Sequence, residues 1–99
     1  MTITKTQNGT QLEILLEGRL DTTTAPELEE ELKTALDGVT ELTMDFEKLE
    51  YISSAGLRVL LNAQKKANAT GGTMTLTHVN DEIMDVFDMT GFISFLTIE

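Results

Sequence analysis

Three stretches of the chain alternate between apolar and polar residues, the period-two pattern of a half-buried β-strand. They cover residues 11–18, 41–46 and 73–78. The dipeptide Asn8-Gly9 precedes the first of them and indicates a hairpin turn, with a short edge strand at 2–7. A last short strand is expected at 94–98. The pattern therefore predicts five strands, of which the first two are antiparallel.

Helical spacing of apolar residues appears between these strands. The first helix is expected to begin at Thr24, where a capping threonine is followed by Pro26 and by Glu27 three residues later. Gly38 is its expected stop. The second helix is expected at about 54–69, after a loop at 47–53. Its predicted buried stripe consists of Leu57, Leu60, Leu61 and Ala67.

The third helix has the clearest end signals. Asn80 offers a capping side chain, and the acids that follow it suit the positive end of a helix. Ile83, Val86 and Phe87 form its predicted inner face, and Gly91 followed by Phe92 indicates a left-handed stop with a hydrophobic clamp.

These elements follow the order β-β-α-β-α-β-α-β in one α/β domain that spans residues 1–99. Alternation of strand and helix predicts a mixed, mostly parallel sheet with right-handed crossovers. Because the strands alternate rather than being apolar throughout, we expect the helices mainly on one face, with the other face partly open. The carboxyl ends of parallel strands collect functional groups. Residues 18–24, 47–54 and 78–80 are therefore expected to converge at one edge.

Charge narrows the range of partners. The chain carries 17 acidic and 7 basic residues, for a net charge of −10, so nucleic acid and anionic membranes are disfavoured partners. The alternative, that acidity only keeps a small domain soluble, stays open. The chain has no cysteine, which excludes disulfides and thiolate chemistry. No segment reaches the roughly 20 apolar residues of a membrane span, and the start lacks a signal pattern. We expect a cytoplasmic protein.

Enzymatic chemistry has little support in the sequence. There is no nucleophile elbow, glycine-rich phosphate loop or helical zinc motif. His78 is the only histidine, and we interpret it as a satisfied residue at a strand end rather than a catalytic base. A solvated helix face explains the acids of residues 81–88 better than a calcium site does. The sequence predicts no enzyme, cofactor or metal.

The start of the second helix is the most informative segment. Its sequence is Ser53-Ser54-Ala55-Gly56. A serine hydroxyl at a helix start caps exposed backbone N–H groups in most proteins. The same position also favours a phosphate, because those N–H groups and the helix dipole stabilise negative charge.

Three stretches together resemble the STAS family. The stretch at 45–61, with Ser54-Ala55-Gly56-Leu57 at its centre, is similar to the family's Ser-x-Gly-Leu helix start. Residues 18–25 resemble its Gly-x-Leu-Asp-x-x-Thr-Ala segment, and residues 87–92 resemble its Phe-Asp-Met-Ser/Thr-Gly segment. Because three motifs occur in order over nearly the whole chain, the resemblance is specific.

The resemblance implies a function. Free-standing family members of this size antagonise an anti-sigma factor that is also a serine kinase; phosphorylation of one serine releases them, and a serine phosphatase resets the cycle. The resemblance places the phosphorylated residue at Ser54. Many antagonists carry Asp directly before that serine, whereas this chain carries Ser53, so Ser53 is the reserve candidate. The resemblance also implies a partner-binding surface, made of Asp21, Thr22, Thr23, Ser53, Ser54, Gly56 and Arg58.

Two other readings stay open at this point. One is a STAS-like module that binds a small ligand, which an apolar patch on the open sheet face would favour. The other is a protein-interaction scaffold without a phospho-switch.

Overall fold

One five-stranded sheet forms the frame of the protein, in the order β1-β2-β3-β4-β5. The computed structural model describes all residues, Met1–Glu99. The elements are β1 Thr2–Asn8, β2 Gln11–Leu20, α1 Ala25–Ala35, β3 Glu41–Ile52, α2 Ser54–Ala69, β4 Thr73–Thr77, α3 Asp81–Thr90, a short 3-10 helix η1 Phe92–Ser94 and β5 Thr97–Ile98. β1 is antiparallel to β2, and all other neighbouring strands are parallel. The predicted α/β class, element order and mixed sheet are confirmed.

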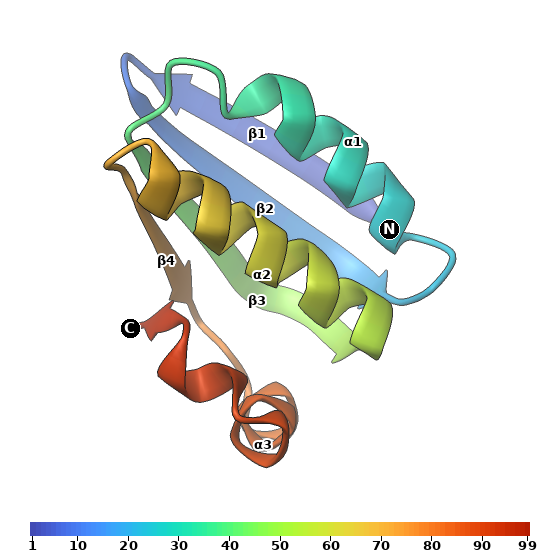
Figure 1. The fold of residues 1–99 in the computed structure, drawn as a ribbon. Coiled ribbons are helices and arrows are strands. Elements are labelled where there is room, and N and C mark those ends of the chain that lie inside the picture. Colours follow the sequence, from blue (N-terminus) through green and yellow to red (C-terminus); the bar gives the residue numbers. More distant parts are fainter.

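Helices α1 and α2 lie side by side over one face of the sheet, and α3 covers the end next to β4 (Figure 1). Between the helices and the sheet lies one hydrophobic core of 22 buried residues. The inward positions of β2 and β3 supply fully buried side chains such as Ile14, Leu16, Met44 and Phe46. This packing explains why the apolar residues of these strands fall on alternate positions.

The predicted loop at 47–53 is wrong, because β3 continues to Ile52. Two irregularities in the β2–β3 register each insert one extra residue into β3, between Asp45 and Lys48 and between Leu49 and Tyr51. Each such β-bulge slips the alternation of side chains by one residue. Buried positions therefore fall at Phe46, Leu49 and Ile52, three apart, and this spacing hides a strand from a period-two search.

Two further boundaries differ from the sequence prediction. Asn8 pairs with Gln11, so the hairpin turn consists of Gly9 and Thr10, one residue later than expected. Gly9 has a φ of +64°, which glycine adopts without steric cost. The expected strand at 94–98 begins only at Thr97, because residues 92–94 form η1.

Helix α2 matches its predicted bounds, but its buried stripe is wider than expected. Leu61 is half-buried, while Val59, Ala63 and Gln64 are buried in addition to the predicted residues. Helix α3 begins and ends as predicted. The Asn80 side chain accepts a hydrogen bond from the N–H of Ile83 at 2.8 Å, and Gly91 is left-handed with a φ of +80°.

The sheet face opposite the helices is polar. Its outward positions on β1, β4 and β5 are mainly threonine, those on the first half of β3 are Glu41, Thr43 and Asp45, and those on β2 are Gln11, Glu13, Leu15 and Glu17. Leu15 is the one aliphatic residue among these positions and is half-buried. The apolar patch that would have favoured a small-ligand site on this face is therefore not present.

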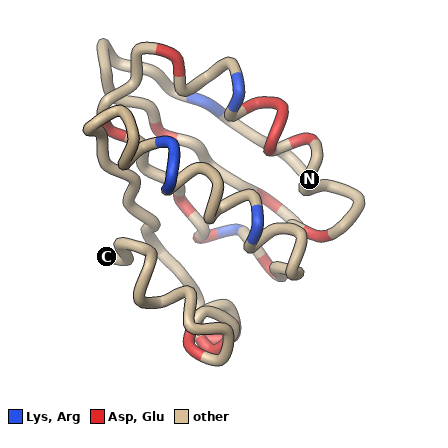
Figure 2. The backbone as a smooth tube through the Cα atoms, in the orientation of Figure 1, with Lys and Arg blue, Asp and Glu red and all other residues tan.

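Charge is distributed unevenly over the helices (Figure 2). Helix α2 carries Arg58, Lys65 and Lys66, whereas α3 carries four acidic residues and no basic one.

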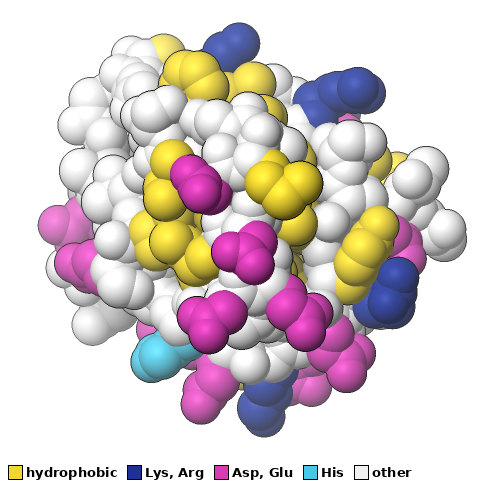
Figure 3. Space-filling model, turned by 90° about the horizontal axis from the view of Figure 1, so that it is seen from below, with side chains coloured by type: hydrophobic (Ala, Val, Ile, Leu, Met, Phe, Trp, Pro, Cys, Tyr) yellow, Lys and Arg dark blue, Asp and Glu magenta, His cyan; other side chains and the backbone are white.

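Near the C-terminus Met89, Ile93 and Phe95 are exposed large hydrophobic residues. Hydrophobic side chains lie among acidic ones on the face shown in Figure 3. None of the helices has the length and apolar character needed to cross a membrane.

Candidate functional site

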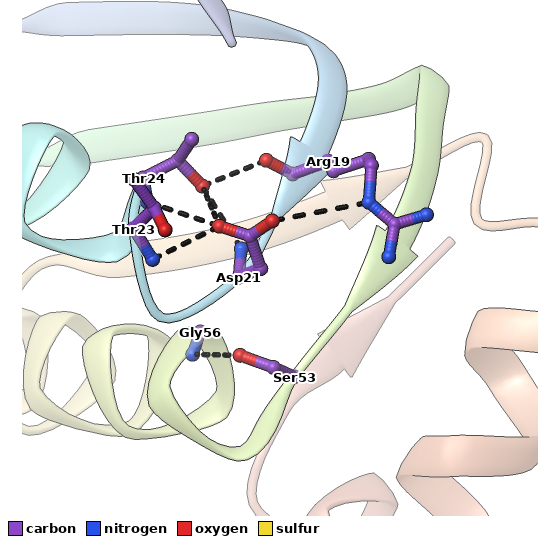
Figure 4. A network of polar contacts seen from close by, with 6 residues as sticks. All are labelled: Arg19, Asp21, Thr23, Thr24, Ser53 and Gly56. Carbon is purple, nitrogen blue, oxygen red and sulfur yellow. Dashed lines mark hydrogen bonds and ion pairs between the residues drawn. The ribbon is translucent and has the colours of Figure 1, made fainter.

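The carboxyl end of β2 and the start of α2 are joined directly. The backbone N–H of Ser53 donates to the carbonyl of Leu20 at 2.9 Å. Asp21 follows Leu20 and Ser54 follows Ser53, so this bond makes neighbours of the two segments that the sequence singled out. Figure 4 shows Asp21 and its partners facing the start of α2 across this joint.

Asp21 organises the turn that leads into α1. Its carboxylate Oδ1 accepts from the backbone N–H of Thr23 at 3.0 Å and of Thr24 at 3.1 Å. The Thr24 hydroxyl accepts in return from the backbone N–H of Asp21 at 2.9 Å and donates to the carbonyl of Arg19 at 2.7 Å. These reciprocal bonds form a capping box. They hold the turn at 21–24 in one conformation.

The capping of the first helix predicted from Thr24 and Glu27 is therefore wrong. Thr24 precedes the first residue of α1, but its side chain makes no capping bond to that helix. Its hydroxyl is already committed to Asp21 and Arg19. Asp21 takes the capping role one turn earlier, and its carbonyl accepts from the N–H of Ala25 at 2.8 Å.

The same network lowers the pKa of Asp21. The backbone N–H of Thr24 is the main cause, and the Thr23 N–H, the Thr24 hydroxyl and the charge of Arg19 add to it, against the opposing effect of partial burial. Each of these donors stabilises the ionised carboxylate. Asp21 therefore places a fixed negative charge at this edge of the sheet at neutral pH.

Arg19 and Tyr51 form a pair that sequence reasoning missed. The Arg19 guanidinium lies 4.2 Å from the centre of the Tyr51 ring, and its Nε lies 3.8 Å from Oδ2 of Asp21. The two residues are partners in the β2–β3 register beyond the second bulge. No local pattern reveals this pairing, because it depends on β3 extending through a segment that reads as a loop.

The two serines differ in what their hydroxyl groups do. The Ser53 side chain caps α2 by accepting from the N–H of Gly56 at 3.4 Å, and Ser53 is partly buried. Ser54 is the first residue of α2 and is exposed. No hydrogen bond within the protein engages its hydroxyl. The first turn of α2 contains no acidic residue, so its positive end is not neutralised by a carboxylate of the helix.

Gly56 has an internal role. It is buried, and a Cβ atom at this position would lie 2.7 Å from Cγ of Leu20 and 2.9 Å from Cγ1 of Ile52. Real Cβ atoms essentially never come so close to other heavy atoms. Only glycine lets α2 approach the end of β2 this closely. Gly56 is thus a packing residue beneath the candidate surface.

The other predicted surface residues lie where a partner can reach them. Thr22, Thr23, Ser54 and Arg58 are all exposed. Thr22 and Arg58 also line a hollow of about 180 Å³ between the starts of α1 and α2, which Ala55 and Pro26 help to form. The candidate surface is therefore continuous from the β2–α1 turn to the first turns of α2.

The third segment expected at this edge lies elsewhere. β4 ends at Thr77, in register with Asp45, so His78 sits level with the middle of β3. Asn80 reaches β3 by donating to the carbonyl of Leu49 at 3.1 Å. Residues 78–80 therefore do not join Asp21 and Ser54, because β3 extends seven residues beyond Asp45.

Comparison with known proteins places this geometry in a family. The family model of the STAS domain matches residues 2–99. The chain belongs to the STAS family.

Relatives within the family share much of the sequence. The chain is 34% identical over 84 residues to BtrV of Bordetella bronchiseptica, covering 84% of this chain and 72% of BtrV. It is 26% identical over 92 residues to the anti-sigma-B factor antagonist of Bacillus subtilis, covering 93% of this chain and 84% of that protein. Over 80 residues it is 32% identical to the anti-sigma-B factor antagonist of Staphylococcus aureus, covering 80% of this chain and 74% of that protein.

The fold is also that of SpoIIAA of Bacillus, an anti-sigma factor antagonist solved in unphosphorylated and phosphorylated forms. The unphosphorylated form superimposes with a TM-score of 0.79 at 20% identity, covering 99% of this chain and 87% of that one. The phosphorylated form gives a TM-score of 0.78 at 21% identity, with 99% and 91% covered.

Proposed function

We propose that this protein is an anti-sigma factor antagonist, and that the surface around Asp21 and Ser54 binds an anti-sigma factor with serine kinase activity. In the unphosphorylated state the antagonist occupies the anti-sigma factor and frees the sigma factor. Phosphorylation of Ser54 releases the antagonist, and a serine phosphatase restores it. Two relatives are named anti-sigma-B factor antagonists, which supports an anti-sigma factor as the partner.

One observation carries the choice of residue: Ser54 is exposed with an unengaged hydroxyl, whereas Ser53 uses its hydroxyl to cap α2. A kinase must place the acceptor hydroxyl in line with the phosphoryl group that is transferred. Ser54 offers its hydroxyl without breaking a bond of the fold. Modification of Ser53 would remove the cap of α2.

The proposed release by one phosphate has a physical basis in the charges of this surface. A phosphate adds a charge of roughly −1.5 to −2 at neutral pH, beside the carboxylate of Asp21. The backbone N–H groups at the start of α2 stabilise that charge within the antagonist. A partner that packs closely on the Ser54 hydroxyl, or that faces Asp21 with acidic groups, must then desolvate or oppose the new charge.

The test begins with affinity capture from the organism that encodes the chain, followed by mass spectrometry. Wild type, Ser54→Asp and Ser54→Asn serve as baits, and the last is the matched control because it changes size without adding charge. We expect wild type and Ser54→Asn to capture a kinase of the anti-sigma class and Ser54→Asp to lose it. The captured kinase is then purified and incubated with ATP and each of wild type, Ser53→Ala and Ser54→Ala.

Phosphate mapped to Ser54 in wild type and Ser53→Ala, and absent from Ser54→Ala, supports the assignment. Phosphate at Ser53 would overturn the choice of residue. Equal capture by wild type and Ser54→Asp would overturn the switch and leave a plain interaction scaffold. Capture of no such kinase by any bait would overturn the proposed partner.

A further inference from the structure

The middle of the open sheet face holds a cluster of metal-ligating side chains that the proposed function does not use. Asp45, Glu47 and His78 each offer a ligand atom, and these atoms all lie within 4.8 Å of one another. We propose that this cluster binds a divalent transition-metal ion of the Zn²⁺ class. The inference is independent of the proposed function, and it departs from the expectation that His78 is a satisfied residue at a strand end.

The fold brings the three ligands together from two elements. Asp45 is an outward position of β3, and its Oδ1 accepts from the N–H of Glu47 at 2.9 Å inside the first β-bulge. A bulge re-aims the side chains next to it. His78 follows β4 in a left-handed conformation with a φ of +55°, and its Nδ1 lies 3.0 Å from Oδ1 of Asp45.

The charge of the cluster is uncompensated. No Lys or Arg side chain forms an ion pair with Asp45 or Glu47; the polar side-chain partner of Asp45 is the imidazole of His78. Only 19% of the Asp45 side chain is exposed, so water screens its charge less than it does on a free surface. In a chain with a net charge of −10, a bound cation lowers the repulsion between these carboxylates. Figure 3 shows the histidine side chain at the rim of the molecule, in cyan, with acidic side chains nearby.

The ligand set selects the kind of ion. One imidazole nitrogen and two carboxylate oxygens suit Zn²⁺, Co²⁺ or Ni²⁺, whereas Mg²⁺ and Ca²⁺ favour sites made of oxygen alone. Zn–N and Zn–O bonds of about 2.0–2.2 Å place neighbouring ligand atoms roughly 3.3–3.6 Å apart in a tetrahedron. Asp45 and His78 are already close to that spacing, and the exposed Glu47 side chain can rotate to meet it. Three protein ligands leave the fourth position to water.

Binding needs a small proton shift and ties two elements together. The Nδ1 atom that faces Asp45 becomes a ligand when the imidazole proton moves to Nε2, the other neutral tautomer. The ion then links the β4–α3 connection to the bulge of β3. We therefore expect Zn²⁺ to stabilise the folded state by mass action.

The single histidine makes the test direct. Untagged protein is titrated with ZnCl₂ in a non-chelating buffer while the imidazole resonances of His78 are followed by NMR. We expect saturation at one ion per chain and no shift with the same concentration of MgCl₂. At 100 times the dissociation constant for Zn²⁺, the folding equilibrium constant measured by urea unfolding should rise about 100-fold.

Variants separate a built site from a lone surface imidazole. Asp45→Asn and Glu47→Gln should each weaken Zn²⁺ binding about tenfold or more. Glu13→Gln, which removes an acid from the same face outside the cluster, should change it less than twofold. Glu47 is exposed, so we expect Glu47→Gln to fold even if Asp45→Asn does not. Amide NMR spectra verify the fold of each variant. Wild-type affinity in Glu47→Gln and Asp45→Asn, or titration that does not saturate below millimolar Zn²⁺, would overturn the proposal.

Discussion

Asp21 and Thr24 cap each other: the Asp21 N–H donates to the Thr24 hydroxyl at 2.9 Å, and the Thr24 N–H donates to the Asp21 carboxylate at 3.1 Å. Replacing Thr24 by Val keeps the shape of the side chain but removes one half of this box. We expect the free energy of unfolding to fall by about 1 kcal/mol. Urea unfolding measures it, with Thr22→Val as the matched control because Thr22 is exposed and makes no such bond. Equal losses in the two variants would contradict the role of the box.

The charge of Asp21 predicts a pH dependence with a definite sign. Its pKa in the folded protein lies below the ordinary value of 3.8, chiefly because the Thr24 N–H donates to the carboxylate. A lowered folded-state pKa gives stabilisation that is complete above the unfolded pKa and is lost as the pH falls through the folded pKa. Asp21→Asn keeps an acceptor oxygen and removes only the charge.

We therefore expect Asp21→Asn to unfold at a lower urea concentration than wild type at pH 7, and the difference to shrink as the pH falls below 3.8 and to vanish below the lowered pKa of the folded state. Asp37→Asn, an exposed acid at the end of α1, controls for the loss of one negative charge. A difference that persists unchanged at pH 2 to 3 would show that the amide disrupts the turn for reasons other than charge.

Much of the fold could be predicted because its signals are local. The bounds of α2, the Asn80 cap and the left-handed Gly91 each depend on a few neighbouring residues, and each is confirmed. The same holds for strands whose side chains alternate without interruption, such as β4. The strand order predicts that the segments of Asp21 and Ser54 meet at one sheet edge, and the bond from Ser53 to Leu20 joins those segments.

What could not be predicted depends on contacts between distant segments. The sequence of the second half of β3 predicts a loop, since bulges against β2 move its buried positions to a spacing of three. That error hid the pairing of Arg19 with Tyr51 and placed His78 at the wrong edge. The cluster of Asp45 with His78 was invisible for the same reason, because it requires the register of β3 with β4.

Gly56 should not tolerate even a methyl group. Alanine raises helix propensity by about 1 kcal/mol relative to glycine, but here its Cβ would lie 2.7 Å from Leu20 and 2.9 Å from Ile52. Overpacking costs typically 1–3 kcal/mol, so we expect Gly56→Ala to lower the free energy of unfolding. Asn62→Ala, at an exposed position of the same helix, should leave stability unchanged or raise it slightly. A stabilised Gly56→Ala would mean that α2 can shift away from β2 without cost.

Substitution of Ser53 should lower the stability of the fold, whereas substitution of Ser54 should not. Ser53→Ala removes the cap of α2, and because its bond to Gly56 is long at 3.4 Å, we expect a loss near the lower end of the range, about 0.5 kcal/mol. Ser54→Ala removes an unengaged hydroxyl and should change stability by less than about 0.5 kcal/mol in either direction. Urea unfolding of both variants measures this. A clear loss of stability in Ser54→Ala would contradict the finding that the Ser54 hydroxyl makes no hydrogen bond within the protein.

A negative charge at Ser54 should stabilise α2 even without a partner. Ser54 is the first residue of the helix and no acid lies in its first turn, so a carboxylate there meets the positive helix end. Relative to Ser54→Asn, Ser54→Asp should gain about 0.3–1 kcal/mol at low ionic strength. Arg58 lies one turn further on the exposed side of α2 and should add roughly 0.3–0.5 kcal/mol as a pair at i,i+4.

Salt and a double-mutant cycle distinguish these two contributions. Unfolding in 1 M NaCl should shrink the difference between Ser54→Asp and Ser54→Asn, since the Debye length falls to about 3 Å. Combining each variant with Arg58→Ala isolates the pair energy from the helix-end energy. If Ser54→Asp is less stable than Ser54→Asn at low salt, repulsion from Asp21 and the other acids outweighs the helix end. A phosphate at Ser54 would then lower the stability of the folded protein.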